Sequence, residues 1–351
     1  MDRRQRLFVI ISDALRFEAV KEFEHLLRQM GRFEAKTEHP ISSLPSYTQL
    51  GMVALLPHKK LSQAESDLVS VDGKNSSGIA NRVKILQSYD AAFSAMGYEE
   101  FLKMDKEQGR AFVKNHTLIY IYHDEIDKMG EKDEANTFNA VESTFQTLIK
   151  LIKQINNFNG TNILIVSNHG FLFTKSPTNE SEFCPKPQGQ IIKLNRRFVI
   201  GKSFTNHSCT HQFSAQELGI ESPYDYLIAK SINKLRTQGG GIRYVHGGAT
   251  LQELTVPVIR VRKKRKQDVR DVEVEIIPLN VVSTNIVNVT LYQKEPVSEK
   301  IRPITFKIAF ELNGEILSDV QTITFDKSDE YGENRELKIP LTFNGSQRKT
   351  Q

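Results

Sequence analysis

The sequence predicts an α/β fold: a mostly parallel sheet with helices on both faces, plus a small all-β C-terminal sandwich domain. Three short apolar runs, Leu7–Ile11, Leu118–Tyr122 and Ile163–Val166, are rich in β-branched or aromatic residues. Continuous apolar strands of this kind are typical of a parallel sheet that is buried on both faces. Beyond residue 263 apolar residues alternate with polar ones, which favours antiparallel strands with one solvated face.

Two stretches of the first part of the chain have the pattern of helices. Residues 138–155 repeat apolar side chains at helical spacing, which predicts a helix with one buried face. That face comprises Phe138, Val141, Phe145, Leu148, Ile149, Ile152 and Ile155. Residues 223–237 follow Ser222-Pro223, a helix-start signal, and end before a run of three glycines at 239–241. A second helix is therefore expected there.

A change of pattern near residue 264 divides the chain into two expected domains, 1–263 and 264–351. Short alternating stretches follow this boundary, at 272–276, 286–292, 304–310, 320–325 and 336–343. Turn residues between them favour a small antiparallel sandwich. Because a core strand begins by residue 7 and the last residues close no element, the chain is expected to be a fragment of a longer protein.

The composition is that of a soluble globular protein, with 39% hydrophobic and 25% charged residues. No run of 18 apolar residues occurs and no signal peptide precedes the first strand, so no membrane association is expected. Cys184 and Cys209 match no paired-cysteine motif, which predicts a reducing, cytoplasmic location. The formal charge of +5 is only a weak indication of an anionic partner.

Potential metal ligands follow each of the three apolar runs. The first run is followed by Asp13, the second by His123 and Asp124 with Asp127 just beyond, and the third by Asn168 and His169. In open parallel sheets ligands bind beyond the carboxyl ends of the strands, so these side chains are expected to meet. Polar loops end strands in any α/β protein. Three in succession that combine Asp and His nevertheless favour a site for zinc or a similar divalent cation.

Two further residues have chemistry that suits such a site. Thr48 lies where the loop 43–47 runs into a predicted helix, and the free N–H groups of a first helical turn favour phosphate. Its hydroxyl is either a nucleophile, if a metal lowers its pKa, or simply a helix cap. His246 lies in a glycine-rich loop before an apolar strand. A lone histidine is usually structural, so its role depends on the residues near it.

Together these motifs resemble the PglZ family of bacterial phage defence, within the alkaline-phosphatase superfamily. The resemblance covers residues 8 to 260 and rests on Ile11–Arg16, Leu44–Gly51, Asn168–Phe171, His246–Gly248 and Gln252-Glu253. It implies a metal-dependent phosphohydrolase whose first domain has an alkaline-phosphatase-like sheet. Residues 171–215 would then form an insert over the mouth of the active site.

The resemblance also implies a role for individual residues. One metal site would comprise Asp13, Thr48, Asn168 and His169, with Thr48 as the nucleophile; the other would comprise Asp127, Glu131 and His246, with His123 and Asp124 as alternative ligands. The implied cofactors are two divalent ions, Zn²⁺ first, with Mn²⁺ or Mg²⁺ as alternatives. In the implied mechanism the Thr48 alkoxide attacks phosphorus, and water then releases the phosphate.

The chain departs from the superfamily pattern at two positions. Glu131 stands where His is usual, which leaves the affinity and identity of the second metal open. Asn168 stands where the superfamily has Asp, so the first metal loses one anionic ligand. Asn168 is therefore expected to weaken or inactivate this chain, either as a natural feature or as an engineered change.

Three functions are compatible with these residues. We favour a phosphodiesterase or nuclease acting on nucleic acid or oligonucleotides in BREX-type anti-phage defence. The alternatives are a phosphomonoesterase and a non-catalytic organiser of a defence complex. Expected partners are nucleic acid and other defence proteins, among them a methyltransferase. Within the basic run 260–266, Lys263, Lys264, Arg265 and Lys266 are either phosphate contacts or part of a solvated interdomain linker.

Overall fold

The computed structural model describes residues 6–64, 66–176, 178–205, 207–239, 241–264, 270–279, 284–298 and 300–343. The chain forms two compact units, one within residues 1–263 and one within residues 264–351. Among the helices of these described ranges, none is both long and apolar enough to cross a bilayer.

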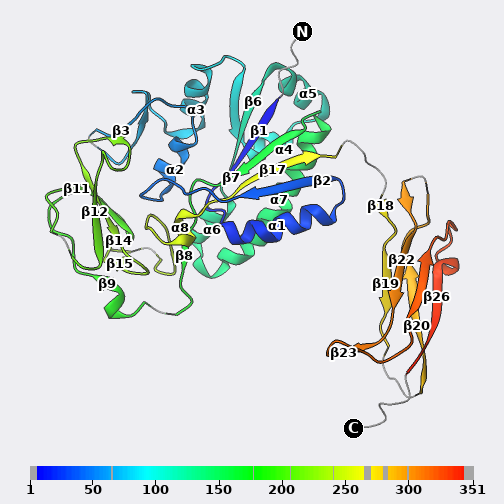
Figure 1. The fold of residues 1–351 in the computed structure, drawn as a ribbon. Helices are drawn as coiled ribbons and strands as arrows, with labels where there is room; N and C mark the ends of the chain where they lie inside the picture. The colour runs from blue at the N-terminus through cyan, green and yellow to red at the C-terminus, as the bar shows by residue number, and fades with distance from the viewer. Residues whose placement is uncertain are drawn as a thin grey trace. The chain divides into compact units, whose positions relative to one another are not determined.

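A six-stranded sheet forms the centre of the first unit (Figure 1). Its order is β2-β17-β7-β1-β6-β5, and its strands are β1 (Leu7–Ser12), β2 (Phe33–Glu38), β5 (Phe93–Gly97), β6 (Leu118–His123), β7 (Asn162–Val166) and β17 (Val258–Lys263). β1 pairs in parallel with β6 and β7, and β5 pairs in parallel with β6, whereas β17 runs antiparallel to β7 and β2. The mostly parallel sheet and its three predicted strands are thus confirmed.

Both faces of this sheet are covered. Because side chains alternate between the faces of a strand, successive residues of β1 enter two different cores. Phe8 and Ile10 pack among α1 (Phe17–Gln29), α4 (Tyr98–Lys103), α5 (Lys106–Asn115), α6 (Glu125–Lys132) and α7 (Thr137–Asn157). Val9 and Ile11 pack with α2 (Thr48–Ala54) and α3 (Gly78–Gln87). This two-sided burial explains why β1 is apolar without alternation.

The helix predicted over residues 138–155 is confirmed as α7. Its buried face includes Phe145, Leu148, Ile152 and Ile155. Phe138 does not belong to that face, because its side chain is 47% exposed and its ring contacts Phe173 edge-on, with ring centroids 5.0 Å apart.

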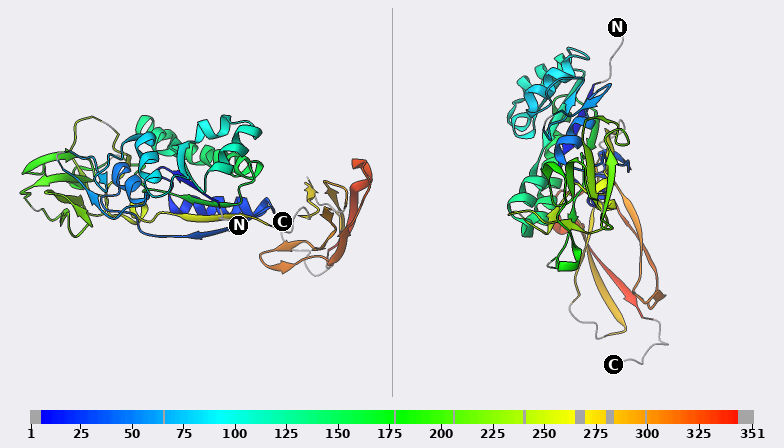
Figure 2. Two further views of the ribbon diagram at one scale, coloured as in Figure 1. Left: turned by 90° about the horizontal axis from the view of Figure 1, so that it is seen from above. Right: turned by 90° about the vertical axis from the view of Figure 1, so that its left-hand side faces the viewer.

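The helix predicted over residues 223–237 is wrong, because the segment contains the strands β14 (Asp225–Ala229) and β15 (Lys234–Leu235). β14 lies between β11 (Phe198–Lys202) and β12 (Thr210–Ser214) in an antiparallel sheet whose fourth strand is β10 (Gln190–Leu194). Tyr226 and Ile228 enter one core and Leu227 enters another. A strand buried on both faces gives a continuous apolar run, which periodicity does not distinguish from a buried helix. This sheet forms a lobe at one end of the first unit (Figures 1 and 2).

Short elements complete the first unit. They are β3 (Leu61–Ser62), β4 (Ser70–Val71), β8 (Leu172–Phe173), β9 (Phe183–Cys184), β13 (Ile220–Glu221), β16 (Tyr244–Val245), α8 (Leu251–Leu254) and two 3-10 turns, Glu134–Asn136 and Glu180–Glu182. β16 pairs with β8, so the segment just before His246 lies beside the segment just after His169.

The two cysteines meet in the lobe. The structure joins Cys184 and Cys209 in a disulfide, with Cα atoms 5.9 Å apart. They are separated by 25 positions and match no motif, so only the fold brings them together.

The second unit is built of strands, which confirms the predicted all-β texture beyond residue 263. They are β18 (Arg270–Asp271), β19 (Val274–Ile277), β20 (Ile286–Gln293), β21 (Ile301–Arg302), β22 (Ile304–Ile308), β23 (Glu311–Leu312), β24 (Glu315–Ile316), β25 (Gln321–Phe325) and β26 (Glu336–Thr342), with a 3-10 turn at Gly332–Arg335. The antiparallel sheet β19-β20-β26 and the pair β22-β25 share one small core around Leu291, Phe325 and Leu341.

Part of the basic run 260–266 is sheet rather than linker. Residues 260–263 belong to β17, where Val261 is buried and Arg262 and Lys263 are exposed. The linker interpretation is therefore wrong for these residues. Lys264 follows the strand, and Arg265 and Lys266 lie outside the described residues. Five residue steps, or about 16 Å of strand, separate Lys263 from the end of β17 that adjoins the carboxyl ends of the parallel strands.

Candidate metal centre

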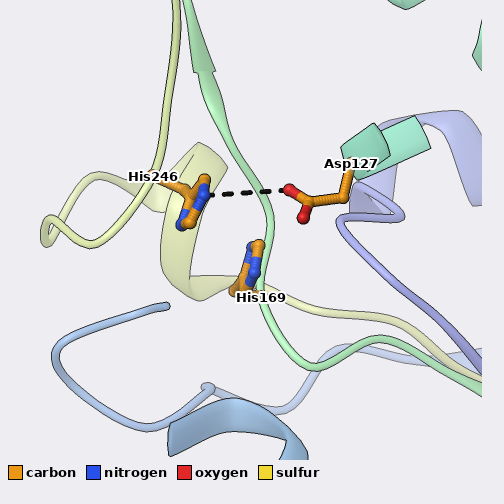
Figure 3. Close-up of side chains that lie close together, drawn as sticks. All are labelled: Asp127, His169 and His246. Carbon is orange, nitrogen blue, oxygen red and sulfur yellow. Dashed lines mark ion pairs between the residues drawn. The ribbon is translucent and has the colours of Figure 1, made fainter. Parts of the chain in front are cut away.

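Four side chains from distant parts of the sequence meet at the carboxyl ends of the parallel strands. Asp13 follows β1, Asp127 lies in the first turn of α6 after β6, His169 follows β7, and His246 follows β16. Ligand atoms of Asp127, His169 and His246 all lie within 4.8 Å of one another (Figure 3). Asp13 adjoins this group, because its Oδ1 is 3.3 Å from His169 Nε2.

His169 is held in one orientation and one tautomer. Its Nδ1 donates to the carbonyl oxygen of Gly170 at 2.9 Å, so Nε2 carries a free lone pair. Complete burial lowers the pKa of His169, which keeps the imidazole neutral near pH 7. The free Nε2 lies 3.1 Å from Thr48 Oγ1. A neutral imidazole with its second nitrogen tied to a carbonyl is the usual form of a histidine metal ligand.

Thr48 is the first residue of α2, as predicted, but it does not cap this helix. The N-cap is Tyr47, and no side-chain cap hydrogen bond is present there. The hydroxyl of Thr48 is directed instead at His169. Gly51 makes this approach possible, because a Cβ at that position would lie 2.5 Å from the carbonyl oxygen of Asn168. The missing side chain lets α2 pack directly on the turn that bears His169.

Asp127 is oriented by a residue that the sequence patterns did not single out. The hydroxyl of Tyr244 donates to Asp127 Oδ1 at 2.7 Å, and the same oxygen lies 3.7 Å from His246 Nε2. A Cβ on Gly130 would meet the Tyr244 ring at 2.5 Å, so α6 packs closely on this tyrosine. The position of Asp127 therefore depends on a contact between α6 and β16, which are far apart in sequence.

Asn168 contacts Asp13 on one side and the backbone on the other. Its Nδ2 donates to Asp13 Oδ1 at 2.7 Å, and its Oδ1 accepts from the backbone N–H of Ala14 at 3.3 Å. Both ends of the amide are thus engaged with the loop after β1. In this arrangement Asn168 holds Asp13 in place, and ligation of a metal by Asn168 stays a prediction.

The remaining predicted ligands lie around this group. Glu131 reaches the surface one helical turn after Asp127, and partial desolvation of its carboxyl group together with the charge of Asp127 raises its pKa. Asp124 is exposed at the start of α6. His123 is buried and its ring nitrogens have other partners, since its Nδ1 lies 3.0 Å from Ser12 Oγ and its Nε2 lies 3.5 Å from Glu125 Oε2. The structure therefore brings His123 to a different set of partners.

The electrostatics of the group suit a bound cation. Burial raises the pKa of Asp13 well above its usual range, and the nearby charge of Asp127 raises it further. Burial and the neighbouring His169 lower the pKa of His246. Among the described residues, the buried Nδ1 of His246 has no hydrogen-bond partner. Two carboxylates and two neutral imidazoles match the ligand preference of zinc and similar divalent ions.

Two cavities with different lining residues adjoin the group. One, of about 650 Å³, is lined by Asp13 and Thr48 together with Arg82, Lys103 and Lys128. The other, of about 370 Å³, is lined by Glu131, His246 and Arg196 among others, and reaches the strand-rich segment through Leu194–Arg196. Residues of the predicted insert 171–215 thus line one entrance.

The sequence patterns assigned no role to the residues that support the group, although Glu253 belongs to a motif that carries the family resemblance. Glu253 and Arg197 are fully buried and form an ion pair, with Arg197 Nη2 2.8 Å from Glu253 Oε2. A signal for Glu253 exists, since Thr250 and Glu253 form a capping box, a recognisable Thr-x-x-Glu pattern. Arg197 and Tyr244 have no comparable local signal.

Residues 1–261 match the family described as the BREX system PglZ alkaline phosphatase-like domain. The alkaline phosphatase-like protein BrxZ of Escherichia coli O9:H4 (strain HS) is 34% identical over 359 residues, which cover 97% of this chain and 41% of that protein. The alkaline phosphatase-like protein PglZ of Bacillus cereus (strain H3081.97) is 33% identical over 348 residues, which cover 96% and 41%. The chain thus spans 41% of the length of these two curated relatives. A solved structure of inactive murine ectonucleotide pyrophosphatase/phosphodiesterase 5 with AMP is similar at a TM-score of 0.48 and 11% identity, over 74% of this chain and 88% of that one.

Proposed function

Because this chain belongs to the PglZ family of BREX system alkaline phosphatase-like domains, we propose that it is a metal-dependent phosphodiesterase with Thr48 as its nucleophile. The observation that supports this best is the 3.1 Å contact between Thr48 Oγ1 and His169 Nε2. This contact brings the Thr48 hydroxyl and the lone pair of His169 Nε2 together beside Asp13, whose Oδ1 is 3.3 Å from the same nitrogen. Both Asp13 and Thr48 line the larger cavity.

Two divalent ions would be held by the residues of this group. Asp13, Thr48 and His169, with Asn168 behind them, would hold the first, and Asp127, Glu131 and His246 the second. Zn²⁺ suits these ligands best, with Mn²⁺ or Mg²⁺ as alternatives. When bound, such ions supply Lewis acidity that stabilises an alkoxide and the developing charge on phosphate oxygens.

The residues of the chain then have distinct tasks in a two-step displacement. Thr48 Oγ1 forms a bond to phosphorus as the bond to the departing alcohol breaks, and the proton lost by the Thr48 hydroxyl is balanced by the one that the departing alcohol gains. Hydrolysis of the resulting Thr48 phosphodiester by water releases the phosphomonoester that carries the second substituent and regenerates the Thr48 hydroxyl. Tyr244 keeps Asp127 oriented through its 2.7 Å hydrogen bond, and Asn168 does the same for Asp13 at 2.7 Å.

The cavities favour a phosphodiester of nucleic acid or oligonucleotides as substrate. Arg82 lines the larger cavity, and its guanidinium lies 4.7 Å from the centre of the Tyr122 ring, which keeps a positive charge in place for an anionic substrate. A second cavity reaches His246 and Glu131. Two separate cavities beside the group would offer space for a substituent on each of the two ester oxygens of a diester, whereas a monoester carries only one substituent.

The biological setting follows from the family and is proposed at the level of the whole protein. The family description names the BREX system, so we propose a role in anti-phage defence in the cytoplasm. The proposed partners are nucleic acid and other defence-system proteins, including a methyltransferase. We propose that the second unit contacts these partner proteins.

The test is turnover by the metal-loaded protein. We expect hydrolysis of bis-p-nitrophenyl phosphate to exceed that of p-nitrophenyl phosphate, to stop in EDTA and to be lost in Thr48→Ala. A preference for the monoester would favour a phosphomonoesterase. If the protein binds metal but hydrolyses neither ester, while it retains defence proteins as well without metal as with it, the site organises a complex instead.

A further inference from the structure

We propose that Glu253, neutralised by Arg197, is a positioning residue that holds the His169 and His246 imidazoles in their relative arrangement and thereby sets the metal affinity of the centre. The inference rests on the proposed function only in taking both histidines as metal ligands. Glu253 does not itself face the ligand atoms. Its effect is transmitted through the two turns that carry them.

The ion pair is fully enclosed and geometrically complete. The side chains of Arg197 and Glu253 are both 0% exposed. The guanidinium donates from Nε to Oε1 at 2.9 Å and from Nη2 to Oε2 at 2.8 Å, which is a bidentate contact. Two further N–H groups of the guanidinium donate to the carbonyl oxygens of Ser231, at 2.7 Å, and Asn233. Arg197 thus ties the site to the turn between β14 and β15.

The carboxylate of Glu253 shapes the loop that carries His246. Its Oε1 accepts from the backbone N–H of Gly248 at 2.8 Å, two residues after His246. Its Oε2 accepts from the hydroxyl of Thr250 at 2.7 Å. A Cβ on Gly248 would lie 2.3 Å from Arg197 Nη2, so this loop rests directly on the ion pair.

The backbone of the same residue reaches the turn that carries His169. The carbonyl oxygen of Glu253 accepts from the N–H of Gly170 at 2.8 Å, and the carbonyl of Gly170 accepts from His169 Nδ1 at 2.9 Å. A Cβ on Gly170 would lie 2.0 Å from the carbonyl oxygen of Gln252, so this turn is packed tightly against α8. One residue therefore contacts both histidine-bearing turns.

The arrangement that Glu253 supports has a defined geometry. The rings of His169 and His246 are stacked, with centroids 4.3 Å apart and planes inclined by 11°. Two neutral imidazoles have little attraction of their own to set this spacing, so the turns must set it. A buried ion pair is an expensive way to gain stability, because both charges are removed from water. Its expected benefit here is the placement of the two ligands.

The experiment compares zinc affinity and stability in four proteins made as the full chain. Glu253→Gln removes the charge and leaves Arg197 unpaired, whereas the double variant Arg197→Gln/Glu253→Gln removes both charges. The control is Glu24→Gln, which alters another buried carboxylate, held by Lys21 and Arg28 on α1. Zinc affinity is measured by competition with a chromogenic chelator, and the melting temperature is measured in EDTA.

We expect Glu253→Gln to lower zinc affinity about 10–100-fold, the usual cost of removing a contact that orients a metal ligand. The double variant should recover melting temperature but not zinc affinity, because the contacts of the Glu253 carboxylate with the Gly248 N–H and the Thr250 hydroxyl in the His246 loop are still altered. Glu24→Gln should have a lower melting temperature than the unaltered protein and the same zinc affinity.

Two results would overturn the proposal. If a folded Glu253→Gln variant binds zinc as tightly as the unaltered protein, the ion pair is purely structural. If Glu253→Gln does not fold, the zinc affinity of the double variant is the test. An affinity equal to that of the unaltered protein would again show that the ion pair is purely structural. Failure of the proposed function is distinguishable: if the centre binds no metal, the unaltered protein itself binds no zinc, manganese or magnesium, and if only catalysis fails, the comparison of zinc affinities among the four proteins still stands.

Discussion

Two buried acidic regions lie beside the same pair of histidines, and they differ in the source of their counter-charge. Glu253 has Arg197 at 2.8 Å, so the protein itself supplies the cation. Asp13 is 4% exposed, and the side chain that donates to it is the neutral amide of Asn168. Its nearby charged neighbour is another carboxylate, Asp127.

The pKa values of these two carboxyl groups express the same contrast. Burial raises the pKa of both, but for Glu253 the hydrogen bonds and charge of Arg197 outweigh burial and lower the pKa below its usual value. For Asp13 burial and Asp127 act together and raise it. A buried carboxylate with its own cation serves the structure, whereas one left without such a cation is suited to receive one from solution.

The largest expected effect comes from removing a ligand in the region that lacks a cation. His246→Ala should reduce turnover by more than about 100-fold, because loss of a residue that only orients a metal ligand already costs up to that much. The fold should survive, because His246 lies at the wall of an open cavity. The matched control is His116→Ala, a half-buried histidine after α5. Diester turnover and circular dichroism are the measurements; an unfolded His246→Ala protein, or one with full activity, would contradict the expectation.

A smaller effect is expected from supplying the missing charge. Asn168→Asp should raise zinc affinity at least about 10-fold, because it adds an anion beside Asp13. In EDTA the same change should lower the melting temperature, since repulsion between two carboxylates replaces a 2.7 Å hydrogen bond. Asn162→Asp, at the other end of β7, is the control and should leave zinc affinity unchanged. If Asn168→Asp binds more zinc but hydrolyses neither monoester nor diester, catalysis by this centre is excluded.

The pH dependence of stability should have opposite signs in the two regions. The pKa of Asp13 is raised on folding, so in EDTA its contribution falls as pH rises above about 3.9, the unfolded pKa of Asp. The pKa of Glu253 is lowered on folding, so its contribution is present above about 4.3 and is lost as pH falls through the folded pKa. Melting curves of Asp13→Asn and Glu253→Gln against the unaltered protein, from pH 3 to pH 7, measure both slopes. Slopes of equal sign would contradict the expected difference between the Asp13 and Glu253 carboxyl groups.

The smallest effect is expected far from either region. Lys263 lies at the opposite end of the strands from the carboxyl ends that carry the site. If Lys263 and Lys264 each contact a phosphate, replacing both with Ala should reduce the log–log salt slope of nucleic-acid binding by about two. Fluorescence anisotropy with a labelled oligonucleotide at several salt concentrations measures this slope. An unchanged slope would leave these lysines without a role in binding.

Sequence patterns predicted the framework of the first unit well, because its strands are buried on both faces. Uninterrupted apolar runs mark β1, β6 and β7, and the strand ends indicated that Asp127 and His169 meet, whereas His246 was expected there only through the family resemblance. The same signal misled at residues 223–237, where a doubly buried strand, β14, has the composition of a buried helix.

The sequence by itself indicated three parallel strands, the start of a helix at Thr48 and the candidate ligands at the strand ends, since each depends on residues close together in the chain or on strand order. Only the tertiary structure decided which partners support them. Arg197 meets Glu253 across 56 positions and Tyr244 meets Asp127 across 117. Gly51 and Gly130 matter because of what lies opposite them, which no local pattern records. The physical reason is that hydrogen bonding and packing inside a protein depend on neighbours in space, and these are set by the completed fold.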